Sequence, residues 1–207
     1  QRNALPEWVL ACGGAIRYQT LGRESGSGRT ESDRSVIRVL VTPSIMESQA
    51  AELLLVTLKA FADTGVFHVT FKFHPYYPKE RVLKAAGIGS LPAYVAEAVD
   101  TPMSELLRKA DVLVYTDTTA AVEALAYGVP IVHLQSGHTI DMDRLGNFDG
   151  GRVSVGTAEE LRAAVRAVVM VSAEEHAARV RQWREIVDLL LPPPDEKTID
   201  LFMPENV

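Results

Sequence analysis

Residues 110–134, with the sequence ADVLVYTDTTAAVEALAYGVPIVHL, give the clearest indication of the fold. Near its start stand four apolar residues, 112–115, which are typical of a short strand buried on both faces. Residues 119–127 follow as a helix rich in alanine, which ends before Gly128. A second apolar run, 129–134, comes next. Strand, helix and strand on short connections predict one parallel βαβ unit.

The same alternation continues on both sides of this unit. Further strands are predicted at 36–41, 67–73, 93–98 and 152–155, and further helices at 44–63, 78–86, 101–110, 157–169 and 172–190. Three of these helices open with Ser or Thr followed three residues later by Glu, which is the capping-box pattern, at Ser44, Thr157 and Ser172. The pattern predicts an α/β fold: a doubly wound, Rossmann-like parallel sheet flanked by helices, with two helices near its C-terminal end.

Composition limits the class of protein. Of 207 residues, 47% are hydrophobic and 23% are charged, which is typical of a globular protein and excludes a disordered chain or a coiled coil. Because 27 acidic residues outnumber 21 basic ones, we expect no nucleic-acid partner. The apolar runs are shorter than the roughly 18 residues of a transmembrane helix. A single cysteine, Cys12, favours a reducing, cytoplasmic location, and the five histidines lack metal-ligand spacing.

The domain prediction has three parts. Residues 35–190 have the size of one complete α/β domain. Residues 1–34 are interpreted as a segment and linker from a missing preceding domain, because 22–34 is rich in Gly, Ser, Thr and charged residues. Residues 191–207 form a tail that begins with a run of three prolines. We therefore expect the chain to be part of a longer protein.

The first candidate binding residues follow the strand 112–115. In open parallel sheets, ligands bind beyond the carboxyl ends of the strands. Thr118 and Thr119 lie there at a helix start, where hydroxyl and amide groups suit a phosphate or diphosphate; the alternative is that Asp117 or Thr118 only caps the helix. Glu123 lies one turn further on the same face and could accept hydrogen bonds from ribose hydroxyls. Its alternative is a solvated or ion-paired surface acid.

Three more candidates follow other strands. His74 precedes Pro75 and could donate to a phosphate or a sugar hydroxyl, or could simply shape a turn. Ser44 stands at a helix start that a ligand phosphate could approach, although a capping box with Glu47 explains it equally well. His138 lies in the long loop 136–151, which suits sugar contacts, with a solvated side chain as the alternative.

Residues 110–132 resemble the donor-binding segment of GT-B glycosyltransferases. The likeness is greatest to bacterial surface-polysaccharide enzymes and to the related non-hydrolysing UDP-N-acetylglucosamine 2-epimerases. Two more motifs, Lys72–Pro75 and Gly13–Tyr18, resemble family motifs and stand in the family's order. The resemblance implies a carboxy-terminal, nucleotide-sugar-binding half, with Thr118 and Thr119 at the diphosphate and Glu123 on the ribose.

The resemblance also implies which ligand the chain binds and which parts of the enzyme it lacks. The ligand would be a nucleotide-diphosphate sugar donor, bound without a metal or a cofactor. The acceptor and the catalytic base would belong to a missing N-terminal domain, so the chain alone would be inactive, and the longer protein could associate peripherally with the inner face of the cell membrane. Retaining members carry a second Glu eight positions before the ribose Glu, where this chain has Tyr115, which favours inversion or epimerisation. A non-catalytic α/β binding or interaction domain is the alternative from another class.

Overall fold

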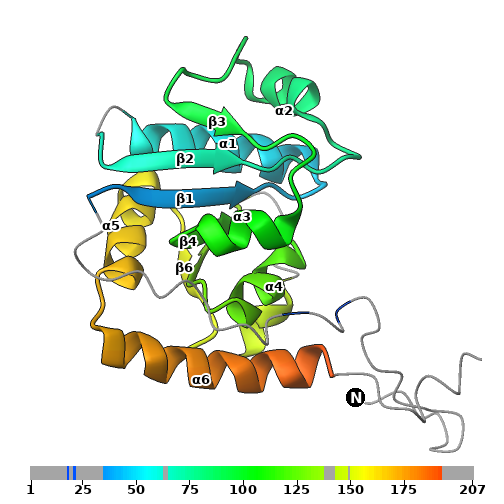
Figure 1. The fold of residues 1–207 in the computed structure, drawn as a ribbon. Coiled ribbons are helices and arrows are strands. Elements are labelled where there is room, and N and C mark those ends of the chain that lie inside the picture. Colours follow the sequence, from blue (N-terminus) through cyan, green and yellow to red (C-terminus); the bar gives the residue numbers. More distant parts are fainter. Residues whose placement is uncertain are drawn as a thin grey trace, which may run out of the picture.

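The computed structural model describes residues 18, 21, 35–62, 65–137, 143–148 and 150–192. Its sheet has six strands in the order β3-β2-β1-β4-β5-β6, and every neighbouring pair is parallel (Figure 1). The strands are β1 Ile37–Thr42, β2 Phe67–Phe71, β3 Val95–Glu97, β4 Val112–Tyr115, β5 Ile131–Leu134 and β6 Val153–Val155. The helices are α1 Glu47–Phe61, α2 Lys79–Ala86, α3 Met103–Lys109, α4 Ala120–Ala126, α5 Ala158–Val169 and α6 Ala173–Leu190. The predicted doubly wound sheet is confirmed.

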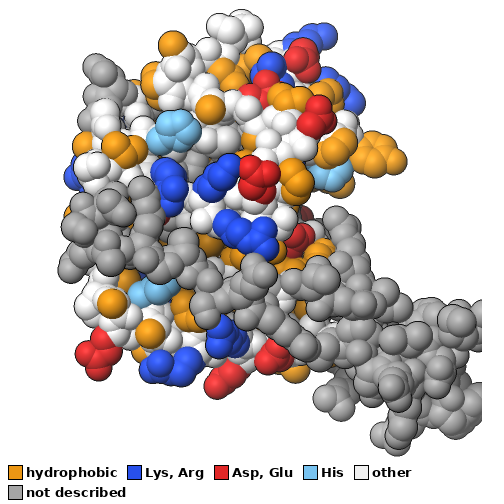
Figure 2. Space-filling view, in the orientation of Figure 1, with side chains coloured by type: hydrophobic (Ala, Val, Ile, Leu, Met, Phe, Trp, Pro, Cys, Tyr) orange, Lys and Arg blue, Asp and Glu red, His pale blue; other side chains and the backbone are white. Residues whose placement is uncertain are grey.

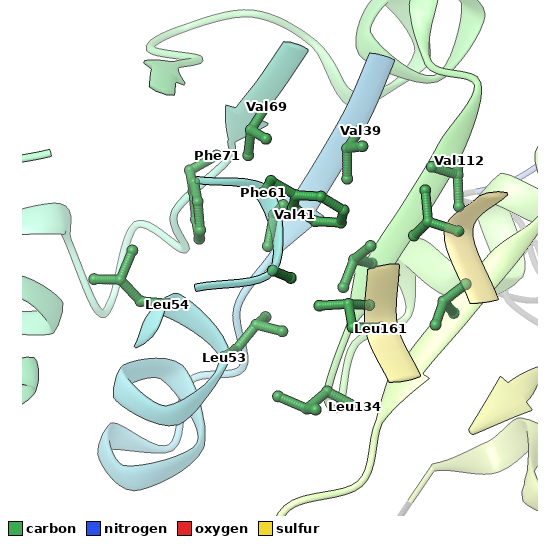
Figure 3. Close-up of a cluster of buried hydrophobic side chains, with 14 of the residues drawn as sticks. Val39, Val41, Leu53, Leu54, Phe61, Val69, Phe71, Val112, Leu134 and Leu161 are labelled. Atoms are coloured by element: carbon green, nitrogen blue, oxygen red, sulfur yellow. The ribbon is translucent and has the colours of Figure 1, made fainter. Parts of the chain in front are cut away.

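Helices cover both faces of the sheet. The first face carries α1, α2 and α5, and its core contains aliphatic and aromatic residues of these helices and the strands. The second face carries α3, α4 and α6, which enclose a separate core. Val39 and Val41 of β1 belong to the first core and Leu40 to the second, which explains why the strand is apolar throughout. In Figure 3, Val39 and Val41 lie among Phe61, Phe71 and Leu161.

The decisive stretch 110–134 folds as one βαβ unit. Its helix α4 ends at Ala126 and is followed by Gly128, whose φ of 69° lies in the left-handed region that glycine adopts without strain. The Gly128 amide donates to the Leu125 carbonyl at 3.0 Å, and the Val129 amide donates to the Ala124 carbonyl at 2.9 Å. This double closure is a Schellman motif, and it turns the chain directly into β5.

The predicted capping boxes have different outcomes. Thr157 and Glu160 form the full reciprocal box at the start of α5, and the Ser172 hydroxyl caps α6. The predicted box at Ser44 is wrong, because α1 has no side-chain cap and begins only at Glu47. The Ser44 hydroxyl instead accepts the Met46 amide at 2.9 Å, and Glu47 is the first residue of the helix and not its third.

We expect Leu161→Ala to lower the free energy of unfolding by about 2–5 kcal/mol, because it opens a cavity in the first core. Leu161 is fully buried between the sheet and α5. Leu189→Ala is the matched control, since this side chain is 70% exposed and should change stability by less than about 0.5 kcal/mol. Urea denaturation measures both, and equal losses would contradict the described packing of α5.

Candidate functional site

The order of the strands reverses between β1 and β4. From β1 the chain proceeds through α1 on the first face, and from β4 it proceeds through α4 on the second face. The loops 43–46 and 116–119 therefore leave neighbouring strands in opposite directions. In doubly wound sheets, ligands bind at such a reversal, beyond the carboxyl ends of the strands. We refer to these two loops together as the β1–β4 switch point.

A direct hydrogen bond joins the two loops. The Ser44 amide donates to the Thr116 hydroxyl oxygen at 3.3 Å, and both residues are 2% exposed. Because the Ser44 hydroxyl oxygen accepts the Met46 amide, this side chain helps to shape the loop after β1. The contact fixes the spacing of the loops from within the protein.

The three candidates on the second loop and α4 lie in sequence along one short path. The Thr118 hydroxyl accepts the Ala120 amide at 3.2 Å, so Thr118 does serve the local turn at the helix start. Thr119 is exposed at the N-cap position of α4, and Asp117 is exposed beside it. Glu123 is half-buried one turn further along. The structure thus brings Thr118 and Thr119 to the switch point, with Glu123 next to them on α4.

His74 lies further along the same edge of the sheet. It follows β2, which is separated from β4 by β1, so about 10 Å, or two strand spacings, separates the ends of β2 and β4. The side chain is exposed and belongs to a turn that begins directly after Phe73. His138 falls outside the described residues.

Two further residues near this edge were missed by the sequence analysis. Glu52 of α1 accepts the Ser136 hydroxyl at 2.5 Å and the Gly137 amide at 3.4 Å, and so fastens the loop after β5 to α1. Thr42, the last residue of β1, is 3% exposed, and its hydroxyl makes no hydrogen bond to any described residue. A buried orphan hydroxyl at a strand end is a position where a bound ligand or water would supply the partner.

A buried polar network holds the C-terminal end of β4, next to the switch point. The Tyr115 hydroxyl donates to the Asp143 carboxylate at 2.7 Å, and Arg152 forms an ion pair with the same carboxylate. The Leu145 amide also donates to Asp143, at 3.2 Å. Burial above all, and then the Asp143 carboxylate, raise the pKa of Tyr115 far above its ordinary value. The protonated Tyr115 therefore holds Asp143 in place, and a carboxylate at position 115 would repel it.

The surface seen in Figure 2 carries charges of both signs. Among the described residues there is no group of three or more His, Cys, Asp and Glu side chains that could hold a metal ion. None of the described helices combines the length and the apolar character that crossing a membrane requires. Figure 2 shows Lys and Arg side chains interspersed with Asp and Glu on the visible face.

Several solved structures share this fold. The calicheamicin glycosyltransferase CalG4 matches 87% of this chain and 46% of its own, with 22% identity and a TM-score of 0.54. The spinosyn rhamnosyltransferase SpnG, solved with spinosyn aglycone, matches 81% of this chain and 45% of its own, with 18% identity and a TM-score of 0.57. The Methanocaldococcus jannaschii UDP-GlcNAc 2-epimerase, solved with UDP-GlcNAc and UDP, matches 79% and 49%, with 15% identity and a TM-score of 0.52.

These matches define the class of fold. No protein-family model and no curated protein matches the sequence. The chain spans about half the length of the solved structures it matches. It has the Rossmann-like fold of one half of the GT-B glycosyltransferases and of UDP-GlcNAc 2-epimerase, as the sequence motifs implied.

We expect Tyr115→Phe to lower the free energy of unfolding by about 1–3 kcal/mol near neutral pH, because it removes one donor from the buried Asp143 carboxylate. The raised pKa of Tyr115 stabilises the folded state fully below about pH 10, where the unfolded side chain keeps its proton as well. Above that pH only the folded protein keeps it, so the wild-type advantage shrinks. Urea denaturation at about pH 8 and about pH 11 measures the difference.

The matched control is Tyr94→Phe, because Tyr94 is exposed and its hydroxyl donates to the Leu58 carbonyl at 3.3 Å. This variant should track the wild-type stability at both pH values. A gap between wild type and Tyr115→Phe that stays constant with pH would contradict the raised pKa of Tyr115.

Proposed function

We propose that this chain is the carboxy-terminal, donor-binding half of a GT-B glycosyltransferase, and that the diphosphate of a nucleotide-sugar donor lies at the β1–β4 switch point. The observation that carries the proposal is the Ser44–Thr116 hydrogen bond, which joins the two loops at the reversal of strand order. A reversal in a six-stranded 3-2-1-4-5-6 sheet is the usual place for a nucleotide.

The side chains at the switch point suit a departing diphosphate. Thr119 offers an exposed hydroxyl at the start of α4, and the Thr118 hydroxyl keeps its own hydrogen to donate, because its oxygen is the acceptor toward Ala120. Neutral donors of this kind stabilise the negative charge that develops as the sugar bond breaks, without a metal ion. Glu123, half-buried one turn away, supplies a carboxylate for the two ribose hydroxyls.

Ligands of the structural neighbours support this chemistry. The M. jannaschii epimerase was solved with UDP-GlcNAc and UDP, and the glycosyltransferase VinC, at 20% identity and a TM-score of 0.50, was solved with DTDP. Each ligand contains a nucleoside diphosphate. We extend this shared group, and neither the base nor the sugar, to the present chain.

The finer parts of the proposal rest on the sequence motifs. They are a role in cell-surface polysaccharide synthesis at the cytoplasmic side of the membrane, and an N-terminal half that holds the acceptor and the catalytic base. Tyr115 favours inversion or epimerisation, since its buried phenol donates to Asp143 where a retaining enzyme of the family carries a carboxylate.

We expect one of UDP, DTDP, CDP, GDP and ADP to bind this chain in a calorimetric titration. Glu123→Ala should weaken that binding about tenfold or more, because two hydrogen bonds to the ribose are lost. Thr119→Val should weaken that binding about threefold to tenfold, because it removes the hydroxyl and keeps a side chain of similar volume. Glu185→Ala is the matched control, since Glu185 is exposed on α6, and its affinity should equal that of the wild type.

Two results would contradict the proposal and favour an alternative function. If no nucleotide binds either this chain or the protein joined to a preceding half, a non-catalytic binding or interaction domain becomes the better account. If the joined protein interconverts UDP-GlcNAc and its 2-epimer, the epimerase alternative holds. Equal affinities of the Glu123→Ala and Glu185→Ala variants would remove Glu123 from the site.

A further inference from the structure

The loop after β5 is fastened to helix α1 by one carboxylate. The Gln135 amide donates to the Val155 carbonyl at 2.8 Å, which extends the pairing of β5 with β6 by one residue. The next two residues leave the sheet and bind the same side chain of α1. The Ser136 hydroxyl donates to Glu52 Oε2 at 2.5 Å, and the Gly137 amide donates to Glu52 Oε1 at 3.4 Å. Both oxygens of Glu52 therefore bind consecutive residues of the loop.

These bonds join elements that lie on the two sides of β4. In the sheet, β4 stands between β1 and β5, so about 10 Å, or two strand spacings, separates the ends of β1 and β5. Leu53, the neighbour of Glu52 on α1, and Leu134, the last residue of β5, both belong to the core of the first face (Figure 3). The loop after β4 leaves toward α4 on the second face. The Glu52 bonds therefore border the β1–β4 switch point on its first face.

The chemistry of the contact makes it strong for a surface loop. An ionised carboxylate accepts shorter and stronger hydrogen bonds than a neutral oxygen does. Glu52 and Ser136 are both half-buried, so water competes less for their bond than it would at an exposed site. Removing the carboxylate takes the shared acceptor from both loop residues, and we expect the loop to move away from α1 as a result.

We propose that Glu52 is a positioning residue for the nucleotide site: by binding Ser136 and Gly137 it fixes the loop after β5 against α1, and so fixes the first-face border of the switch point. The inference rests on the proposed function for its purpose, since the diphosphate would lie between this border and the loop 116–119. Glu52 acts through the loop and does not touch the ligand, because a carboxylate would repel a diphosphate at contact distance.

The hold on the loop can be measured without any nucleotide. Solvent-exchange NMR spectra report how often the Gly137 amide is released from its acceptor. We expect Glu52→Ala to speed this exchange about tenfold, and Glu52→Gln, which keeps one acceptor oxygen, to speed it less. Glu159→Ala is the matched control, because Glu159 also joins α1 to another element, by an exposed ion pair with Lys59 at 3.1 Å, and should leave the exchange of Gly137 unchanged. Equal exchange rates in the wild type and in Glu52→Ala would overturn the proposal.

A double-mutant cycle tests the link to the ligand. Glu52→Ala and Ser136→Ala should each weaken binding of the nucleotide identified by calorimetry about threefold to tenfold, and the double variant should lose no more than the more affected single variant. Glu52→Gln should recover part of the affinity, which a loss of folding would not explain. Losses that multiply in the double variant, or an unchanged affinity in Glu52→Ala, would overturn the role of Glu52 as a positioning residue. If the wild type binds no nucleotide, the proposed function fails, while the exchange measurement still decides whether Glu52 holds the loop.

Discussion

The pairing of β1 with β4 is the contact on which the rest of the site depends. The register places Thr42 opposite Tyr115, so the two strands end level and their loops can meet through Ser44 and Thr116. A slip of one residue would turn Tyr115 to the other face of the sheet, away from Asp143. One register therefore sets both the switch point and the buried network behind it.

Much of the fold could be predicted because its signals are local. The apolar runs 112–115 and 129–134, with Gly128 between helix and strand, indicate strand, helix and strand within a single short segment. The Thr157 box also needs only its own four residues. The box at Ser44 failed for a tertiary reason, because the Ser44 amide is bound to Thr116, 72 positions further along the chain, and its hydroxyl accepts the Met46 amide.

The sequence placed candidates after two of the strands, at Ser44 and at Thr118 to Glu123, but it did not show that the two groups meet. Thr118, Thr119 and Glu123 share one loop and helix, so their spacing alone places them together. Glu52 holds Ser136 across 84 positions, and no periodicity indicates such a contact. The strand order is equally hidden, since the same succession of strands and helices also builds sheets of order 2-1-3-4-5. The strand order therefore determines which loops lie next to the switch point.

We propose that a nucleoside diphosphate binds at the β1–β4 switch point. Amide chemical shifts of the labelled protein, followed while the nucleotide identified by calorimetry is added, test it residue by residue. We expect the largest changes in loops 43–46 and 116–119, with smaller ones at His74. Changes concentrated at the opposite edge of the sheet, where the strands begin, would contradict the account.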